Sequence, residues 1–519
     1  MASHSVSSLR RIPLPHWPTM MLLIGYIVFW VELYVIKLPF GHTSCLAWLL
    51  SLIGLSIFAV FPRLKFPLPV RLLGGIVLLL MAVYLGIVIE ASSRPVHLIQ
   101  EYDALNYHLS IPRQHLLVHH FKHLIWSSAD LYLLPIDYAL APFCLVTKMP
   151  NKWPMLFFAF GLMAMVYHLV KDFAIDNMDK RAQWAMVGLL GYHVLMIQLG
   201  TAMLDVVIAY CFFACWHSLR HKYYGLAAIE AAFFLASKPF IFPPMILLLL
   251  AVMGVARLFI HHYKWQMMDQ LPWNAQEHQR FLFLLIGVLG IVALPGMIKS
   301  LMYAGTPLFP FGVGILKPII NTDTVHWQNL VDNAKQCLQI KDSYGHGTGF
   351  MAFIQHWWLI AVPEHSVNNA YDYPVGLVYL LMWVPLIGIV MGLMHYRKFF
   401  GIIVIMAGWW TIWWFTSQQT RFLLIPLIAM LIIVMARLPR INGLLKCLLT
   451  GALLIETISL IGAHRADWGR PDSAIIRPQD LHWMNIDLNK GPYVVYEPDV
   501  AYAPVPVEVK GKSVFIIDN

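Results

Sequence analysis

Long apolar runs alternate with short polar turns along most of the chain, and this alternation predicts the fold. Runs near the roughly 20 residues needed to cross a bilayer recur as far as residue 462, so we expect about 13 membrane spans. The expected spans are 17–36, 45–61, 72–91, 152–170, 184–200, 202–219, 224–237, 240–257, 281–299, 375–395, 401–416, 422–436 and 443–462. The pattern therefore predicts an all-α polytopic transmembrane protein.

Two long segments and the C-terminal end interrupt this pattern. We expect residues 92–151 and 300–374 to form loops with interfacial helices, the first of them an amphipathic helix over 109–124 whose histidines are solvated. In the small C-terminal tail, residues 493–496 and 513–517 have the composition of strands. The chain divides into an N-terminal transmembrane extension (1–71), a membrane domain (72–462) and a C-terminal segment (463–519).

The distribution of Lys and Arg predicts how the chain crosses the membrane. Short loops on one side carry most of the basic residues, whereas the short turns on the other side carry Lys37, Lys238 and Arg421. Because the more basic loops stay in the cytoplasm, we expect a cytoplasmic N-terminus. The two long loops and the tail then face the extracytoplasmic side of a plasma membrane.

Composition agrees with a protein whose main partner is the lipid bilayer. Of the 519 residues, 59% are hydrophobic and 12% are charged, against about a quarter charged in soluble domains. The net charge of +9 suits contact with anionic lipid, and no motif for binding nucleic acid is present. The 6 cysteines lack the spacing of a zinc site or a disulfide framework.

A polar run follows the third expected span. It reads Glu101-Tyr102-Asp103-Ala104-Leu105-Asn106-Tyr107-His108-Leu109. Ionisable groups are costly in hydrocarbon, so the run must lie at the membrane edge, where a functional site is expected. Asp103 is the main candidate, and Asn106, Tyr107 and His108 could orient it or bind a substrate. Glu101 is either a second functional acid or a solvated residue.

Three further charged residues are expected on the same side of the membrane. Asp205 begins an apolar helix, where the alternative to a functional role is stabilisation by the helix dipole. Lys238 and Arg421 occupy short turns, and each could instead extend toward lipid headgroups. Two cations beside an acid suit an anionic phosphate, which Arg can bind through two parallel hydrogen bonds.

Five segments resemble motifs of the GT-C superfamily of membrane glycosyltransferases, most closely the bacterial relatives of protein mannosyltransferases and lipid A aminoarabinose transferases. The segments are 103–109 (DALNYHL), 201–210 (TAMLDVVIAY), 236–244 (ASKPFIFPP), 305–311 (GTPLFPF) and 418–427 (QQTRFLLIPL). They occur in the expected order and cover about residues 70–440. Two features depart from the family: Thr306 replaces the usual Asn, and the first acidic loop follows the third expected span instead of the first.

The resemblance implies a transferase of the bacterial inner membrane. It would move a sugar from a polyprenyl-phosphate donor to an acceptor at the extracytoplasmic face, with inversion. Asp103 would be the general base, while Lys238 and Arg421 would bind the departing phosphate. Glu101 and Asp205 would position the substrate, and with Asp103 they are candidate ligands of a divalent ion (Mg, Mn or Zn). The acceptor remains open among glycans, lipids and proteins.

Two other functions remain open. A polytopic transporter or lipid flippase would use Asp205, Glu230 and Glu456 as relays within the membrane, and it would move its substrate without cleaving it. A non-catalytic GT-C-like subunit of a larger membrane assembly would keep the fold without the activity.

Overall fold

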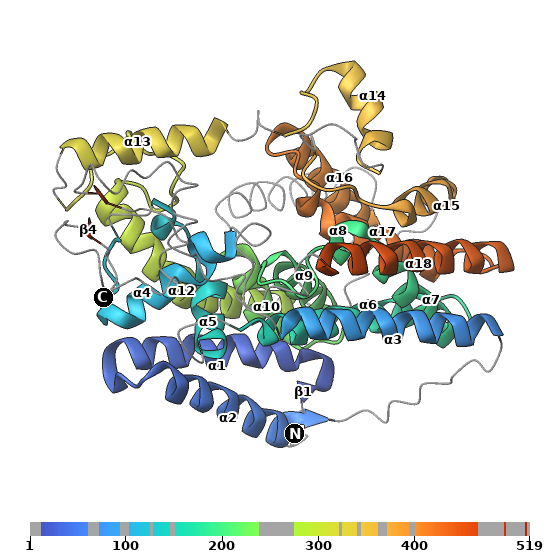
Figure 1. The fold of residues 1–519 in the computed structure, drawn as a ribbon, viewed down its shortest axis with the longest axis horizontal. Helices are drawn as coiled ribbons and strands as arrows, with labels where there is room; N and C mark the ends of the chain where they lie inside the picture. The colour runs from blue at the N-terminus through green and yellow to red at the C-terminus, as the bar shows by residue number, and fades with distance from the viewer. Residues whose placement is uncertain are drawn as a thin grey trace.

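The computed structural model describes residues 12–60, 72–93, 103–124, 128–145, 151–237, 275–320, 324–339, 344–361, 371–393 and 400–465, together with 493–494 and 514–515. These residues form a helical assembly (Figure 1), which confirms the prediction of a helical fold. The described strands form two parallel pairs of two residues each: β1 (Ile12–Pro13) with β2 (Ala59–Val60), and β3 (Tyr493–Val494) with β4 (Val514–Phe515).

The α-helices have the following bounds. They are α1 (Trp17–Val31), α2 (Phe40–Phe58), α3 (Leu72–Ser92), α4 (Ser110–Val118), α5 (Pro135–Cys144), α6 (Trp153–Phe173), α7 (Met178–Leu190), α8 (His193–Met196), α9 (Asp205–Arg220), α10 (Tyr224–Leu235), α12 (Ala275–Ala304), α13 (Thr324–Gln339), α14 (Phe350–Leu359), α15 (Leu377–Leu393), α16 (Phe400–Phe415), α17 (Leu424–Arg437) and α18 (Gly443–Arg465). The shorter helical turns are η1 (Leu14–His16), η2 (Glu32–Ile36), η3 (Ala104–His108), η4 (Ser128–Leu131) and η8 (Thr420–Leu423).

Among the described residues, 6 helical stretches are long and apolar enough to cross a membrane. They are Leu14–Ile36, Leu73–Ser92, Trp153–Phe173, Gln279–Ala304, Thr420–Arg437 and Gly443–Gly462. Each corresponds to one of the expected spans. The count of about 13 spans is not confirmed, and the span expected at 240–257 lies outside the described residues.

The helix expected at 184–200 is wrong, because the chain breaks after α7 and turns into the short α8. The backbone N–H of His193 donates to the carbonyl oxygen of Val375 at 3.0 Å. A Cβ on Gly191 would lie 2.6 Å from Cγ2 of Val378, so α15 packs directly against this turn. Contacts with a distant segment therefore interrupt a sequence that is apolar enough to continue as a helix.

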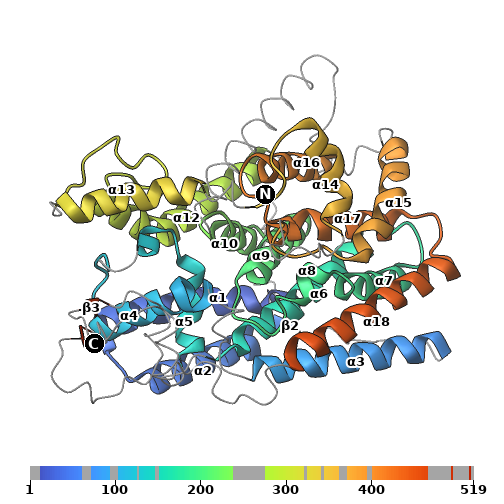
Figure 2. The same cartoon turned by 45° about the horizontal axis from the view of Figure 1, so that its top comes forward.

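The core is built around α6, α9 and α17. α6 packs against α7, α9 and α17, while α9 also packs against α10 (Figure 1). The N-terminal α1 and α2 both pack against α5, and α3 lies beside α18 at the edge of the assembly (Figure 2). In α3 and α12, large apolar side chains face outward, among them Leu79, Phe283 and Ile286, which are 66%, 80% and 70% exposed. Such a surface suits contact with lipid.

Candidate functional site

Asp103 and Arg421, 318 residues apart in the sequence, form an ion pair. Nη1 of Arg421 donates to Oδ2 of Asp103 at 2.9 Å. Asp103 stands directly before the π-helical turn η3, and Arg421 lies in η8, which leads into α17. Their side chains are 22% and 14% exposed, respectively, so the pair is shielded but still open to a ligand.

Several contacts hold the guanidinium group of Arg421 in place. Oε1 of Gln419 accepts hydrogen bonds from Nε and Nη2 at 3.2 and 3.1 Å. Oδ2 of Asp372 lies 3.4 Å from the same Nε atom. The loop that carries Asp372 is tied to η8, since Oγ1 of Thr420 donates to the carbonyl oxygen of Tyr371 at 2.9 Å. Arg421 is therefore oriented before any ligand arrives.

Asp372 is a residue that the sequence alone did not single out. It lies just before α15, and its φ of +76° is an uncommon backbone conformation for an L residue. Backbone strain of this kind occurs often in functional sites. Burial, followed by the charge of Asp372, raises the pKa of the neighbouring Tyr373 to about 12, so this phenol stays neutral. The sequence does contain one signal for Asp372, namely its position shortly before an apolar helix. The same kind of position marks Asp205 as a candidate.

Asp205 brings a third carboxylate to this site. It is the first residue of α9 and is 6% exposed. Its charge acts on Arg421 together with the charges of Asp103 and Asp372. These four residues, named here the Arg421 cluster, come from four separate segments of the chain. Carboxylates outnumber cations three to one within the cluster.

Tyr107 and His108 follow Asp103 on η3 but face different partners. Burial, and then the charge of Asp103, hold the pKa of Tyr107 well above its ordinary value, so its hydroxyl stays protonated. The Tyr107 ring meets Tyr132 edge-on, with 6.2 Å between centroids. His108 instead places Nδ1 2.5 Å from Oδ1 of Asp137 in α5, and both side chains are buried. Tyr107 therefore belongs beside the Arg421 cluster, and His108 anchors η3 to α5.

The other expected site residues are not placed by the structure. Glu101 and Lys238 lie outside the described residues, and the description of Asn106 is limited to its backbone in η3. The roles expected for them stay predictions.

No protein-family model, curated protein or solved structure matches the chain. The resemblance to the GT-C superfamily therefore rests on the five sequence segments. Three of these segments, 103–109, 201–210 and 418–427, contribute Asp103, Asp205 and Arg421 to the one cluster.

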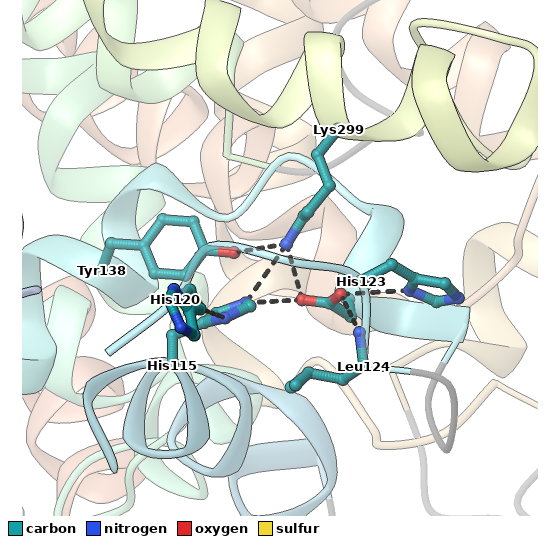
Figure 3. A network of polar contacts seen from close by, with 7 residues as sticks. His115, His120, His123, Leu124, Tyr138 and Lys299 are labelled. Atoms are coloured by element: carbon teal, nitrogen blue, oxygen red, sulfur yellow. Dashed lines mark hydrogen bonds and ion pairs between the residues drawn. The ribbon is translucent and has the colours of Figure 1, made fainter. Parts of the chain in front are cut away.

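A second cluster of buried polar side chains surrounds Asp130, and Figure 3 shows its partners His115, His123 and Lys299. Nζ of Lys299, from α12, donates to Oδ1 of Asp130 at 2.6 Å, and Nε2 of His115 lies 2.7 Å from the same oxygen. Oδ2 accepts from the backbone N–H of Leu124 at 2.8 Å and lies 3.1 Å from Nδ1 of His123. Burial alone would raise the pKa of Asp130, but Lys299 and His115 hold it well below its ordinary value.

The amphipathic interfacial helix expected over 109–124 is wrong in length and in surroundings. α4 ends at Val118, and the chain then turns through His119 with a φ of +50°. His115 is 0% exposed and His123 is 9% exposed, so these two are not solvated, whereas His120 is exposed as expected. The reason is that Asp130 and Lys299 supply polar partners inside the protein, which a local hydropathy pattern cannot show.

A group of side chains that could hold a metal ion lies apart from the Arg421 cluster. Among the described residues, one group of His, Cys, Asp or Glu side chains has its ligand atoms within 4.8 Å of one another, and it consists of Asp172, His217 and His221. Asp103 and Asp205 are not part of that group. Because Glu101 lies outside the described residues, a divalent ion at Glu101, Asp103 and Asp205 stays a prediction.

Proposed function

We propose that this chain is a membrane glycosyltransferase that moves a sugar from a polyprenyl-phosphate donor to an acceptor at the extracytoplasmic face. The observation that supports this function best is Arg421, held by contacts to Gln419 and Asp372 and paired with Asp103 at the end of an apolar helix. Sugar transfer from a phosphate ester needs a cation for the leaving group and a base for the acceptor. The Arg421 cluster offers both.

Arg421 would bind the phosphate of the donor. Oδ2 of Asp103 accepts a hydrogen bond from Nη1 of Arg421. A phosphate oxygen can replace a carboxylate oxygen there, because the guanidinium fork matches both groups. As the sugar–phosphate bond breaks, the guanidinium offsets the charge that develops on phosphate. Lys238 is expected to assist.

Asp103 would act as the general base once it is released from Arg421. Losing a hydrogen bond to its charged form makes a carboxylate more basic. Asp103 then accepts the proton of the acceptor hydroxyl or amine while that group attacks the anomeric carbon. The electron pair of the breaking carbon–oxygen bond stays on the phosphate, and direct attack inverts the anomeric centre. Donor binding would thus activate the base.

The other members of the cluster would keep Arg421 in position during this exchange. Asp372 and Gln419 hold its Nε edge, so the guanidinium need not move when Asp103 leaves. Asp205 adds a charge at the start of α9, and Tyr107 provides a neutral hydroxyl next to Asp103.

The test is Asp103→Asn in the purified full chain, supplied with a polyprenyl-phospho-sugar and membrane-derived acceptors. Release of polyprenyl phosphate should fall by roughly 10²–10⁴-fold. The matched control is Asp332→Asn, the same chemical change at an acid of α13 that is 57% exposed, and it should keep the full rate. An undiminished rate in folded Asp103→Asn protein would exclude Asp103 as the base.

A transporter or flippase is the second candidate, favoured by two acid–histidine pairs, of which the first is buried and the second partly buried. Oε1 of Glu230 lies 2.7 Å from Nδ1 of His16, and Oε2 of Glu456 lies 2.7 Å from Nδ1 of His193. A transporter would return the donor intact in the same assay and would move it across vesicles. A non-catalytic subunit would show neither turnover nor transport by itself.

A further inference from the structure

A histidine pair lies at the opposite end of α9 from Asp205. His217 is in the last turn of α9, and His221 follows directly after the helix, one turn further on. Their ring centroids are 4.3 Å apart. Asp172, near the end of α6, places Oδ2 2.8 Å from Nε2 of His221. With a rise of about 1.5 Å per residue, His217 lies roughly 18 Å along the helix from Asp205, so this is a separate site.

The ligand atoms of these three side chains already converge. They lie within 4.8 Å of one another before any ion is bound. Zn²⁺ is bound by imidazole nitrogen and carboxylate oxygen at about 2.0–2.2 Å, which puts tetrahedral ligands roughly 3.4 Å apart. Small side-chain rotations are enough to bring the ligand atoms from within 4.8 Å of one another to about 3.4 Å, and the helices need not move.

A series of buried hydrogen bonds positions His217 through its Nδ1 atom. Nδ1 of His217 lies 2.9 Å from Nε2 of His16, and Nδ1 of His16 lies 2.7 Å from Oε1 of Glu230. His16 and Glu230 are both 0% exposed. Glu230 also accepts hydrogen bonds from the hydroxyls of Thr19 and Ser218, each at 2.7 Å. Glu230 is thereby fixed as an acceptor on both oxygens.

These hydrogen bonds can set the tautomer that His217 needs as a metal ligand. If His16 donates from Nδ1 to Glu230, its Nε2 accepts from the Nδ1–H of His217. The lone pair of His217 is then on Nε2, the nitrogen not engaged by His16. Histidines that bind metals commonly donate their other ring N–H to such a partner, which fixes the orientation of the ring.

We propose that Asp172, His217 and His221 bind one divalent transition-metal ion, with Zn²⁺ as the best match. Two imidazole nitrogens and one carboxylate oxygen are a donor set typical of zinc, and they leave a fourth position for water. The ion would join the ends of α6 and α9 and, through His16, the start of α1. Its role is therefore to stabilise this end of the helix assembly.

Arg220 competes with the metal for Asp172. Nε of Arg220 lies 3.4 Å from Oδ2 of Asp172, and its Nη2 donates to the backbone carbonyl of the same residue at 3.0 Å. Metal binding must displace the contact between Nε of Arg220 and Oδ2 of Asp172. It must also displace the proton shared between His221 and Asp172. The Arg220 side chain is 39% exposed and can move into solvent. Replacing Arg220 should therefore tighten metal binding.

The experiment uses the full chain in detergent, purified without a histidine tag and stripped with a chelator. Zn²⁺ titration by calorimetry should show one ion per chain, and Co²⁺ should give a four-coordinate spectrum without thiolate charge transfer. His217→Ala and His221→Gln should each lose stoichiometric binding. His16→Phe should keep the stoichiometry and weaken the affinity by roughly 10–100-fold. Arg220→Gln should bind more tightly than the unaltered chain.

His42→Ala is the control, because it removes an exposed histidine of α2 that lies outside the group. It should bind Zn²⁺ as the unaltered chain does and should show the same rise in thermal midpoint with Zn²⁺. His221 is 39% exposed, so its replacement carries little risk for folding, which size-exclusion chromatography checks. No binding by the unaltered chain, unchanged binding by His217→Ala and His221→Gln, or a thiolate–cobalt band would each overturn the proposal. None of these outcomes bears on sugar transfer.

Discussion

Removing one or the other partner of the Asp103–Arg421 ion pair should have unequal effects on stability. Within the described part of the chain, Arg421→Gln removes the cation on which the charges of Asp103, Asp205 and Asp372 act. Asp103→Asn leaves Arg421 with two carboxylates and removes one source of repulsion between acids. In an isolated ion pair, by contrast, the two substitutions would cost about the same.

The size of the difference follows from the geometry. Two unit charges about 4 Å apart attract by about 4 kcal/mol at an effective dielectric constant near 20. The Asp103 and Arg421 side chains are 22% and 14% exposed, so solvent reduces this value. We expect Arg421→Gln to cost roughly 2–4 kcal/mol, near the range for breaking a buried pair. Asp103→Asn should stay within about 1 kcal/mol of the unaltered chain, as for partly exposed pairs.

Thermal unfolding in detergent, followed by tryptophan fluorescence at one heating rate, measures this difference. Arg421→Gln should lower the midpoint clearly, and adding Asp103→Asn to it should restore part of the loss. Equal destabilisation by the two single substitutions would refute the three-carboxylate description of the cluster. If the difference is found, a loss of activity in Asp103→Asn cannot be ascribed to unfolding.

Two further predictions concern buried groups. Burial lowers the pKa of His356 in α14 to about 4, and the neutral ring accepts from the indole N–H of Trp410 at 3.0 Å. The neutral His356 ring therefore contributes fully to the free energy of unfolding above about pH 6.5. This contribution is lost as the pH falls toward 4, by up to about 1.4 kcal/mol per pH unit. His356→Gln should flatten this part of the curve of thermal midpoint against pH, and an unchanged curve would contradict the assignment. Lys299→Met should cost up to roughly 3–5 kcal/mol, because it removes the ammonium group beside the buried charge of Asp130 and leaves that charge with the weaker partners His115 and His123. The double variant with Asp130→Asn should recover part of this loss, and no recovery in thermal unfolding would argue against direct coupling.

The sequence predicts how the candidate residues lie relative to the membrane surface better than it predicts which residues come together in the site. Asp103, Asp205 and Arg421 each lie next to an expected apolar span, and the expected topology puts all three near the same membrane surface. Their lateral contact depends on how α9, α17 and η3 pack, which hydropathy does not contain. Asp372 was overlooked although it also precedes an apolar run.

The errors share one physical cause, namely partners that are distant in sequence. His115 looked solvated because Lys299, which contacts it at 3.2 Å, is 184 residues away. The helix expected at 184–200 is broken by packing against the start of α15. Local periodicity reports which side chains are polar or apolar. It does not report which of them find a partner inside the fold.

The length of α9 has a consequence for where the proposed reaction takes place. Its 16 residues span about 24 Å, less than the roughly 30 Å hydrocarbon core. If α9 crosses the membrane as expected from the sequence, with its Arg220 end at one interface, Asp205 would lie about 6 Å below the other, and any tilt would move it deeper. The preceding residues Thr201 and Ala202 are buried by protein, which non-helical backbone at that depth would require. The sugar–phosphate of a lipid donor would therefore have to descend below the headgroups to reach Arg421. There, less water competes for the phosphate, and hydrolysis of the donor is suppressed.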